Sequence, residues 1–183
     1  ASALLTRSNG EVNDKMKRTL DGTVAPGSGL SVSISGSGWA LTGFTLNLTA
    51  ADTAAALKGT LIRLFFDGRQ TAEVPAGNFF GTGYSYNSYN TRFTGADPDG
   101  TLRSSWLMPF RDSCRIGIYN ESDDTLAVSG LISLAPYDWT ANSMHCGASF
   151  REYPGFETAV SEHTGGTGLH SDINIADLKG RGL

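Results

Sequence analysis

The stretch TLIRLFFDGRQTAEVP, residues 60–75, contains the clearest secondary-structure signal in the chain. Residues 60–66 are rich in aromatic and aliphatic side chains and predict a strand. Asp67-Gly68 follows, and this dipeptide suits a two-residue type I′ hairpin because both central residues need positive φ. The return strand covers residues 70–74 and ends at Pro75, which cannot donate a hydrogen bond to a neighbouring strand. The stretch therefore predicts an antiparallel hairpin.

Period-two alternation extends this β signal in both directions. Residues 30–35 and 39–49 alternate apolar and polar side chains, which is typical of strands with one buried face. Residues 50–58 (AADTAAALK) contain the one good helix candidate. Further strands are predicted at residues 102–108, 115–119, 126–134, 144–151 and 173–178. The sequence therefore predicts an all-β protein, an antiparallel jelly-roll sandwich of about eight strands with one short helix.

The same alternation predicts which side chains form the core. The inward positions are Val32, Ile34, Leu46, Leu48, Leu61, Leu64, Phe66, Ile116, Ile118, Leu131 and Ile175. Ile62 and Phe65 are expected to face the opposite way, toward a second layer or a partner.

Composition and charge exclude several classes of partner. Hydrophobic residues make up 39% of the 183 residues and charged residues 17%, so the chain can bury a core. The net charge of -4 repels phosphate backbones, and we therefore expect no nucleic-acid partner. The apolar runs are far shorter than the ~20 residues of a membrane-spanning helix, so no membrane span is expected.

The first 26 residues differ from the rest of the chain. Residues 1–26 are polar and uneven, with Lys15, Lys17 and Arg18 close together. We interpret them as an N-terminal arm with little structure of its own, ordered by a partner, although a solvated edge explains them equally well. Residues 27–183 are predicted to form a single jelly-roll domain.

A long loop is predicted at residues 78–100, between the hairpin and the next strand. Loops of this length are uncommon in compact domains and often have a functional or interfacial role. This one is rich in Tyr, Asn and Gly, and Tyr supplies rigid, amphipathic contact area. The candidate residues for assembly or binding are Tyr84, Tyr86, Tyr89, Arg92 and Phe93. A second polar, Gly-rich loop covers residues 153–171.

No arrangement of residues resembles a complete active site. The acids are spread over turns, one hairpin strand and the second loop, and no pair is marked as convergent, so we expect no catalytic residues. Asp97 and Asp99 resemble a fragment of a calcium loop but lack the further carboxylates that such a loop needs. We therefore expect no cofactor and no metal, with calcium at Asp97 and Asp99 as a weak alternative.

Two features stay open at this point. Cys114 and Cys146 both fall in or beside predicted strands, and they form either a disulfide or two buried free thiols. Asn47 and Asn120 fit the N-glycosylation pattern, which matters only for a chain secreted by a glycosylating host.

The region from residue 61 to residue 120 resembles the DUF2961 family, which includes glycoside hydrolase family 172. The family pattern is a strand ending in Phe-Asp-Gly, then Val-Pro-x-Gly-Asp-Phe-Phe-Gly, a long loop, and Met-Pro-Phe before the next strand. The matching residues are Phe66, Asp67, Gly68, Val74, Pro75, Gly77, Phe79, Phe80, Gly81, Met108, Pro109 and Phe110. Residues 175–182 resemble the segment that closes the first half of the family's fold.

The resemblance implies an incomplete member of that family. Its members are built from two tandem jelly rolls, form trimers or hexamers, and include enzymes that act on fructofuranosides and arabinofuranosides. Their catalytic glutamates lie in the second jelly roll, in motifs that this sequence lacks, so the chain is similar to the first, N-terminal half only. Arg69 and Asn78 also stand where the family has acids.

Two interpretations are compatible with these observations. In the first, the chain is a non-catalytic structural protein that assembles with copies of itself into a ring, filament, tubule or capsid-like shell. In the second, it is part of a family 172 glycoside hydrolase or a carbohydrate-binding module, with Trp106 among the stacking residues. The first implies homo-oligomers as partners and an extracellular or particle-associated location, and carbohydrate is the other candidate partner.

Overall fold

The hairpin of residues 60–75 forms as the sequence predicts. Strand β5 (Thr60–Phe66) pairs with strand β6 (Arg69–Pro75) in antiparallel register. Asp67 and Gly68 connect the two strands with φ of 51° and 79°, the left-handed conformation that a type I′ turn requires. The structure, a computed structural model, describes residues 16–152. By internal contacts the chain divides into two units, residues 1–150 and 151–183, and the strands and helices named below belong to the first unit.

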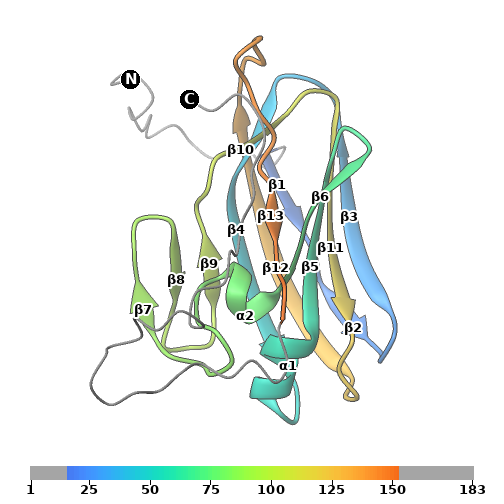
Figure 1. The fold of residues 1–183 in the computed structure, drawn as a ribbon, viewed down its shortest axis with the longest axis vertical. Helices are drawn as coiled ribbons and strands as arrows, with labels where there is room; N and C mark the ends of the chain where they lie inside the picture. Colours follow the sequence, from blue (N-terminus) through green and yellow to red (C-terminus); the bar gives the residue numbers. More distant parts are fainter. Residues whose placement is uncertain (1–15, 153–183) are drawn as a thin grey trace, which may run out of the picture. The chain divides into compact units, whose positions relative to one another are not determined.

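The strands form two sheets that pack face to face (Figure 1). The first sheet contains the order β2-β12-β4-β9, and the second contains β3-β11-β5-β6. Their bounds are β2 Gly22–Val24, β12 Leu126–Pro136, β4 Trp39–Thr49, β9 Leu102–Ser104, β3 Gly29–Ser35 and β11 Ser113–Asn120. This order is that of a jelly roll, and it confirms the predicted all-β fold.

Shorter elements complete the described chain. They are β1 Lys17–Thr19, β7 Tyr89–Asn90, β8 Thr94–Ala96, β10 Met108–Phe110, β13 Ala148–Ser149, helix α1 Thr53–Gly59 and helix α2 Ala76–Phe79. The predicted helix at residues 50–58 begins later, at Thr53, because the side chain of Asp52 caps it by accepting hydrogen bonds from the N–H groups of Ala54 and Ala55.

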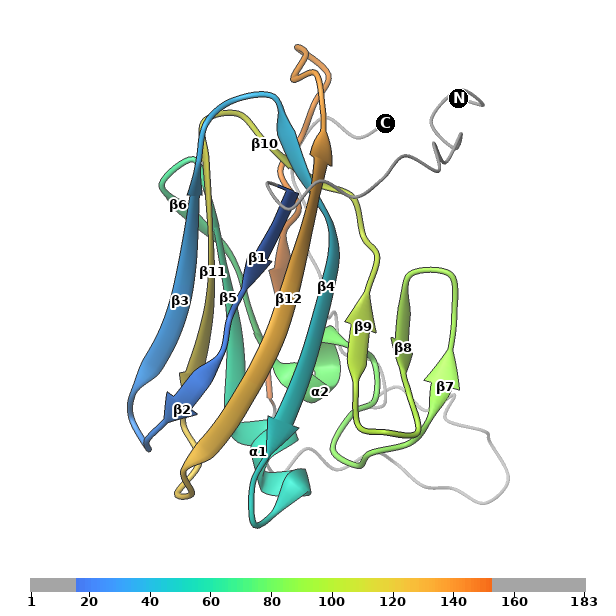
Figure 2. The same ribbon diagram turned by 180° about the vertical axis from the view of Figure 1, so that it is seen from behind.

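Part of the predicted N-terminal arm belongs to the sandwich, which corrects its interpretation as a segment with little structure. Strands β1 and β2 both pair with β12, so residues 17–24 supply the first strand of the jelly roll (Figure 2). Leu20 and Val24 are buried in the core. Leu20 and Val24 fit period-two alternation, but Gly22 stands between them on the same face, so the alternation lacks its middle apolar residue and gives no clear strand signal.

Two of the predicted core positions, Leu61 and Leu131, are wrong by one residue. Ile62 is fully buried and Leu61 is only half-buried, because Ile62 shares a strand face with Leu64 and Phe66. In β12, Ile132 is buried where Leu131 was expected. The remaining predicted core residues within residues 16–152 are buried or half-buried, and Ile175 lies outside the described residues.

The long segments between strands are more ordered than expected. The predicted loop at residues 78–100 begins in α2 and contains the β7–β8 hairpin. The predicted strand at residues 102–108 is two strands, β9 and β10, and that at residues 144–151 contributes only β13. The predicted strand at residues 173–178 and the loop at residues 153–171 lie outside the described residues.

Asn120, at the end of β11, joins the first strand of the jelly roll to the β11–β12 turn. Its side-chain nitrogen donates to the carbonyls of Val24 (3.1 Å) and Asp124 (2.7 Å), and its Oδ1 accepts from the N–H of Ser122 at 2.9 Å. The residue is fully buried. A glycan on this nitrogen is therefore incompatible with the folded domain, although the sequence motif fits.

We predict that Asn120→Ala lowers the free energy of unfolding by about 2–3 kcal/mol, since it leaves buried carbonyls without their donor. Urea denaturation of the purified protein measures the change. Asn87→Ala, in the exposed part of the 78–100 segment, is the control and should shift stability by less than about 0.5 kcal/mol. Equal effects of the two substitutions would contradict the structural role of Asn120.

Candidate functional site

The carboxylate of Asp67 binds the turn between β10 and β11. Its Oδ1 accepts hydrogen bonds from the backbone N–H groups of Asp112 (2.7 Å) and Ser113 (2.8 Å), and its Oδ2 accepts from that of Arg111 (3.0 Å). The N–H of Asp67 donates in return to the carbonyl of Ser113 at 2.9 Å. These bonds join two turns that are more than 40 residues apart in the sequence.

His145 completes the surroundings of this carboxylate. Its Nε2 lies 2.6 Å from Asp67 Oδ2, and its ring stacks on Phe66 with an interplanar angle of 10°. Trp139 contacts the same imidazole at a centroid distance of 4.9 Å. We refer to Asp67, His145 and the amides of residues 111–113 as the Asp67 hub.

The hub stabilises the ionised form of Asp67. Burial raises the pKa of the carboxyl, but the hydrogen bonds from the amides of Asp112, Ser113 and Arg111 and from His145 together outweigh it and lower the pKa to about 2. The side chain is 17% exposed, so water screens these interactions only in part. Asp67 is therefore a structural anion at neutral pH.

The residues that carry the family resemblance support this hub and the core. Met108, Pro109 and Phe110 are buried in β10, which pairs with the start of β4, and Phe110 stacks against Phe66 at 6.4 Å. Phe79 and Phe80 pack against Phe44, and Phe80 is fully buried.

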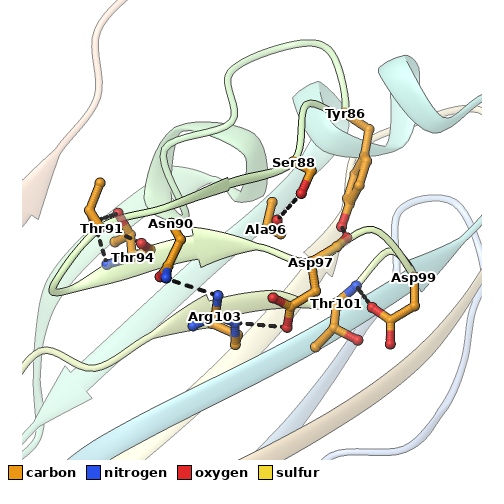
Figure 3. Close-up of polar contacts among 10 residues, drawn as sticks. All are labelled: Tyr86, Ser88, Asn90, Thr91, Thr94, Ala96, Asp97, Asp99, Thr101 and Arg103. Carbon is orange, nitrogen blue, oxygen red and sulfur yellow. Dashed lines mark hydrogen bonds and ion pairs between the residues drawn. The ribbon is translucent and has the colours of Figure 1, made fainter.

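Strands β7, β8 and β9 form an extension at the side of the sandwich (Figure 1). Tyr86 donates its hydroxyl hydrogen bond to the carbonyl of Asp97, and Tyr89 donates to that of Phe80 (Figure 3 for Tyr86). Burial raises the pKa of Tyr86, and the nearby charges of Asp99 and Asp97 raise it further. Both tyrosine hydroxyl groups thus donate their hydrogen bonds to backbone carbonyls of the first unit.

Arg103 and Asp97 form an ion pair on the extension, with Nε and Oδ2 at 2.8 Å (Figure 3). The guanidinium also lies 3.5 Å from Asn90 Oδ1. The Asp99 carboxylate accepts from the N–H of Thr101 at 3.0 Å, which lowers the pKa of Asp99. Both carboxylates have these partners within the chain, and calcium binding here stays a prediction. Among residues 16–152, no three His, Cys, Asp or Glu residues form a group suited to a metal ion.

An aromatic pair lies exposed on the same extension. The rings of Phe93 and Trp106 stack at a centroid distance of 4.2 Å, although the two residues are 39% and 46% exposed. Leu107 beside them is 48% exposed, and the guanidinium of Arg92 lies 5.4 Å from the Phe93 ring centroid. We call Arg92, Phe93, Trp106 and Leu107 the aromatic face. Of the predicted loop residues, Arg92 and Phe93 belong to it, and Tyr84 is exposed elsewhere, beneath Lys58.

A hollow of about 500 Å³ borders this face and has Trp106 on its rim. Its other walls come from α2, β10 and the segment around β13, and include Phe79, Met108 and Phe150. The sequence marked Trp106 as a stacking residue, but nothing local in it indicates that residues 146–150 line the same hollow.

Both cysteines are free thiols. Cys114 is buried in β11, and burial raises the pKa of its thiol to about 12, with a further contribution from the charge of Asp67. Burial also raises the pKa of the half-buried Cys146. Raised pKa values keep both side chains as thiols, which indicates packing roles rather than nucleophilic ones.

A family model described as GH172 domain-like matches residues 14–131. This range is more than half of the 183 residues and includes β1 through most of β12. The chain belongs to this family. The family assignment agrees with the resemblance found in the sequence.

Two solved structures are similar to this GH172 domain-like chain at low identity. One is PliG of Aeromonas hydrophila, a periplasmic inhibitor of g-type lysozyme, with 13% identity, a TM-score of 0.34, and coverage of 66% of this chain and 87% of PliG. The other is the major capsid protein P2 of bacteriophage PM2, with 14% identity, a TM-score of 0.43 and coverage of 67% of this chain. The match spans about half of P2 (52%). No curated protein matches the sequence.

Within residues 16–152, no helix is long and apolar enough to cross a membrane.

We predict that Asp67→Asn lowers the free energy of unfolding at pH 7 by about 2 kcal/mol and removes part of its dependence on acid pH. Because the folded-state pKa of about 2 lies below the ordinary value of 3.8, the stabilisation is complete above about pH 4 and is lost as the pH falls through 2. Asn tolerates the positive φ of this position, so the turn itself is kept.

Urea unfolding between pH 7 and pH 2 measures this difference, and Asp112→Asn is its control. The Asp112 side chain is 72% exposed, and the substitution keeps the backbone N–H that Asp67 accepts. The control should follow the wild-type pH profile. An Asp67→Asn protein that loses as much stability as the wild type between pH 4 and pH 2 would show that Asp67 does not carry the effect.

Proposed function

We propose that this chain is a non-catalytic jelly-roll subunit that assembles with copies of itself through the aromatic face. The observation that carries the proposal is the Phe93–Trp106 pair. The two rings stack on each other, yet both remain exposed to solvent, as does Leu107. A contiguous exposed apolar surface next to a hollow is typical of a protein–protein contact.

The composition of this face is that of a strong contact centre. Trp and Arg are enriched among the residues that dominate binding energy, and a rigid ring pair loses little conformational entropy when a partner covers it. Arg92 lies over Phe93 at the rim of the pair, where its charge stays in water. The hollow beside Trp106 provides space for an apolar side chain of the neighbouring copy.

The acidic residues support a structural role. Asp67 is held in the hub, Asp97 is paired with Arg103, and Glu73 accepts from Arg63 at 2.8 Å and from Gln70 at 2.9 Å. Each of these three carboxylates has partners within the chain, which supports a structural rather than a catalytic role for them.

We expect Phe93→Ser combined with Trp106→Ser to weaken self-association by at least about 30-fold, since truncating a buried anchor typically costs about 2 kcal/mol. Light scattering over a concentration series, with negative-stain electron microscopy, measures the size of the assembly. Circular dichroism shows whether the β fold is intact.

Met144→Ser is the matched control because Met144 is also exposed, at 52%, but lies outside the aromatic face. It should assemble like the wild type. A wild-type protein that stays monomeric at high concentration, or a double variant that assembles normally, contradicts the proposed function.

A second candidate function, carbohydrate binding, is favoured by a bowl at the end of the sandwich next to the Asp67 hub. This bowl has a volume of about 570 Å³ and is lined by Trp139, Tyr137, Arg111, Asp112 and Asp138 among others. An aromatic ring beside carboxylates suits a sugar, whose C–H face stacks on the ring while its hydroxyl groups donate to the acids.

Trp139→Ala tests this candidate. If the bowl binds carbohydrate, the substitution abolishes retention on immobilised polysaccharides and leaves the size of the assembly unchanged. Met144→Ala is the control, because Met144 is exposed but does not line the bowl, and it should keep retention. Equal retention of the wild type and Trp139→Ala would exclude the bowl as the sugar site.

A further inference from the structure

The edges of the two sheets are protected unequally. At the edges of the larger sheet, β1 carries Lys17 and Arg18, β10 contains Pro109, and β2 and β7 have only three and two residues. At one edge of the smaller sheet, β13 has two residues. Short length, charge and proline are the usual means by which proteins prevent pairing of edge strands.

Strand β3, at the other edge of the smaller sheet, has none of these protections. Its seven residues, GLSVSIS, contain no charge and no proline. Its register with β11 is continuous from Gly29 to Ser35, without a bulge. β3 is the last strand at this end of its sheet, and no strand within residues 16–152 pairs with its outer edge (Figures 1 and 2). An unpaired edge of this length, without charge, proline or bulge, is a template for another strand.

We propose that β3 pairs in antiparallel register with β3 of a second copy, about a two-fold axis at Val32, to form one continuous sheet across the two copies. This inference rests on the proposed self-assembly and names a second contact for it. Self-pairing suits this edge because β3 itself has no charged residue, so two copies meet without like charges on the paired strands, and the Arg115 charge lies one strand away on β11.

The sequence of β3 is compatible with itself in this register. Pairing about Val32 places Leu30 opposite the partner's Ile34 and Ser31 opposite the partner's Ser33. Apolar side chains then meet on the inward face, where Leu30 and Val32 are half-buried, and hydroxyl groups meet on the exposed face. Such cross-strand pairs stabilise a sheet, and no like charges oppose each other.

The two contacts have different consequences for assembly. A two-fold contact is isologous and by itself stops at a dimer. The aromatic face provides a separate contact on the extension, away from β3. A chain with both contacts can continue from dimer to larger particle, whereas either contact alone gives a smaller species.

Added charge on the exposed face of β3 tests the pairing. Ser31→Glu with Ser33→Glu places like charges opposite each other across the axis and should weaken association by about tenfold. The monomer tolerates the change because residue 33 lies opposite Arg115 of β11. Ser31→Lys with Ser33→Lys should weaken association in the same way, and circular dichroism checks its fold because the new lysine at residue 33 lies opposite Arg115 within the monomer. An equimolar mixture of the acidic and basic variants should restore it, since each Glu then faces a Lys.

Thr125→Glu with Ala127→Glu is the matched control, because both residues are exposed and have the same spacing and added charge. It should associate like the wild type. If the wild type assembles and the acidic β3 variant assembles equally well, the edge proposal fails and the proposed function stands. If the wild type is monomeric, the proposed function fails and the edge proposal with it.

Hydrogen exchange provides a second measurement, because a folding defect does not make amide protection rise when the protein associates. Every second amide of β3 already bonds to β11, so the informative amides are those of Ser31 and Ser33, which point away from β11. Their protection should rise when the wild type associates and should stay low at the same positions in the acidic variant. Protection of these two amides in monomeric wild-type protein would place another segment of the same chain on this edge and overturn the proposal.

Discussion

An ionised carboxylate with little exposure to water needs hydrogen-bond donors around it, and at Asp67, whose side chain is 17% exposed, three successive backbone amides supply them. This requirement fixes the position of the β10–β11 turn relative to the β5–β6 hairpin. The left-handed conformation of Asp67 and Gly68 brings the carboxylate to the amides, so the hairpin turn and the hub depend on each other. His145 then joins a third part of the chain to the same carboxylate.

The hub gives the family motif a physical meaning. Phe-Asp-Gly supplies the carboxylate, and Met-Pro-Phe supplies the buried strand that precedes the three amides. Phe66 and Phe110, one from each motif, stack beneath them. Two short segments separated by more than 40 residues thus form a single structural unit, and the same unit fixes the floor of the Trp139 bowl through Arg111 and Asp112.

Local patterns in the sequence predicted the hairpin, most of the strands and the jelly-roll class, because alternation and turn chemistry act within a few residues. They failed where tertiary contacts decide the outcome. Residues 17–24 become strands only because β12 pairs with them. Leu61 and Leu64 are three residues apart in one strand, so they lie on opposite faces and only Leu64 is fully buried. In the candidate site, Phe93 and Arg92 were found from composition. The inward bonds of Tyr86 and Tyr89 were not, since their acceptors are carbonyls that a sequence does not mark.

The pairing of β12 with β1, β2 and β4 has a consequence for how the chain folds. The first strand of the jelly roll finds its neighbour more than 100 residues later in the sequence, so the larger sheet closes only after β12 has been synthesised. Folds dominated by such distant pairings fold slowly, and their unpaired edges stay exposed meanwhile. A neutral strand such as β3 is then accessible on every incomplete chain. Slow synthesis and low local concentration of nascent chains therefore favour correctly folded chains over premature aggregates.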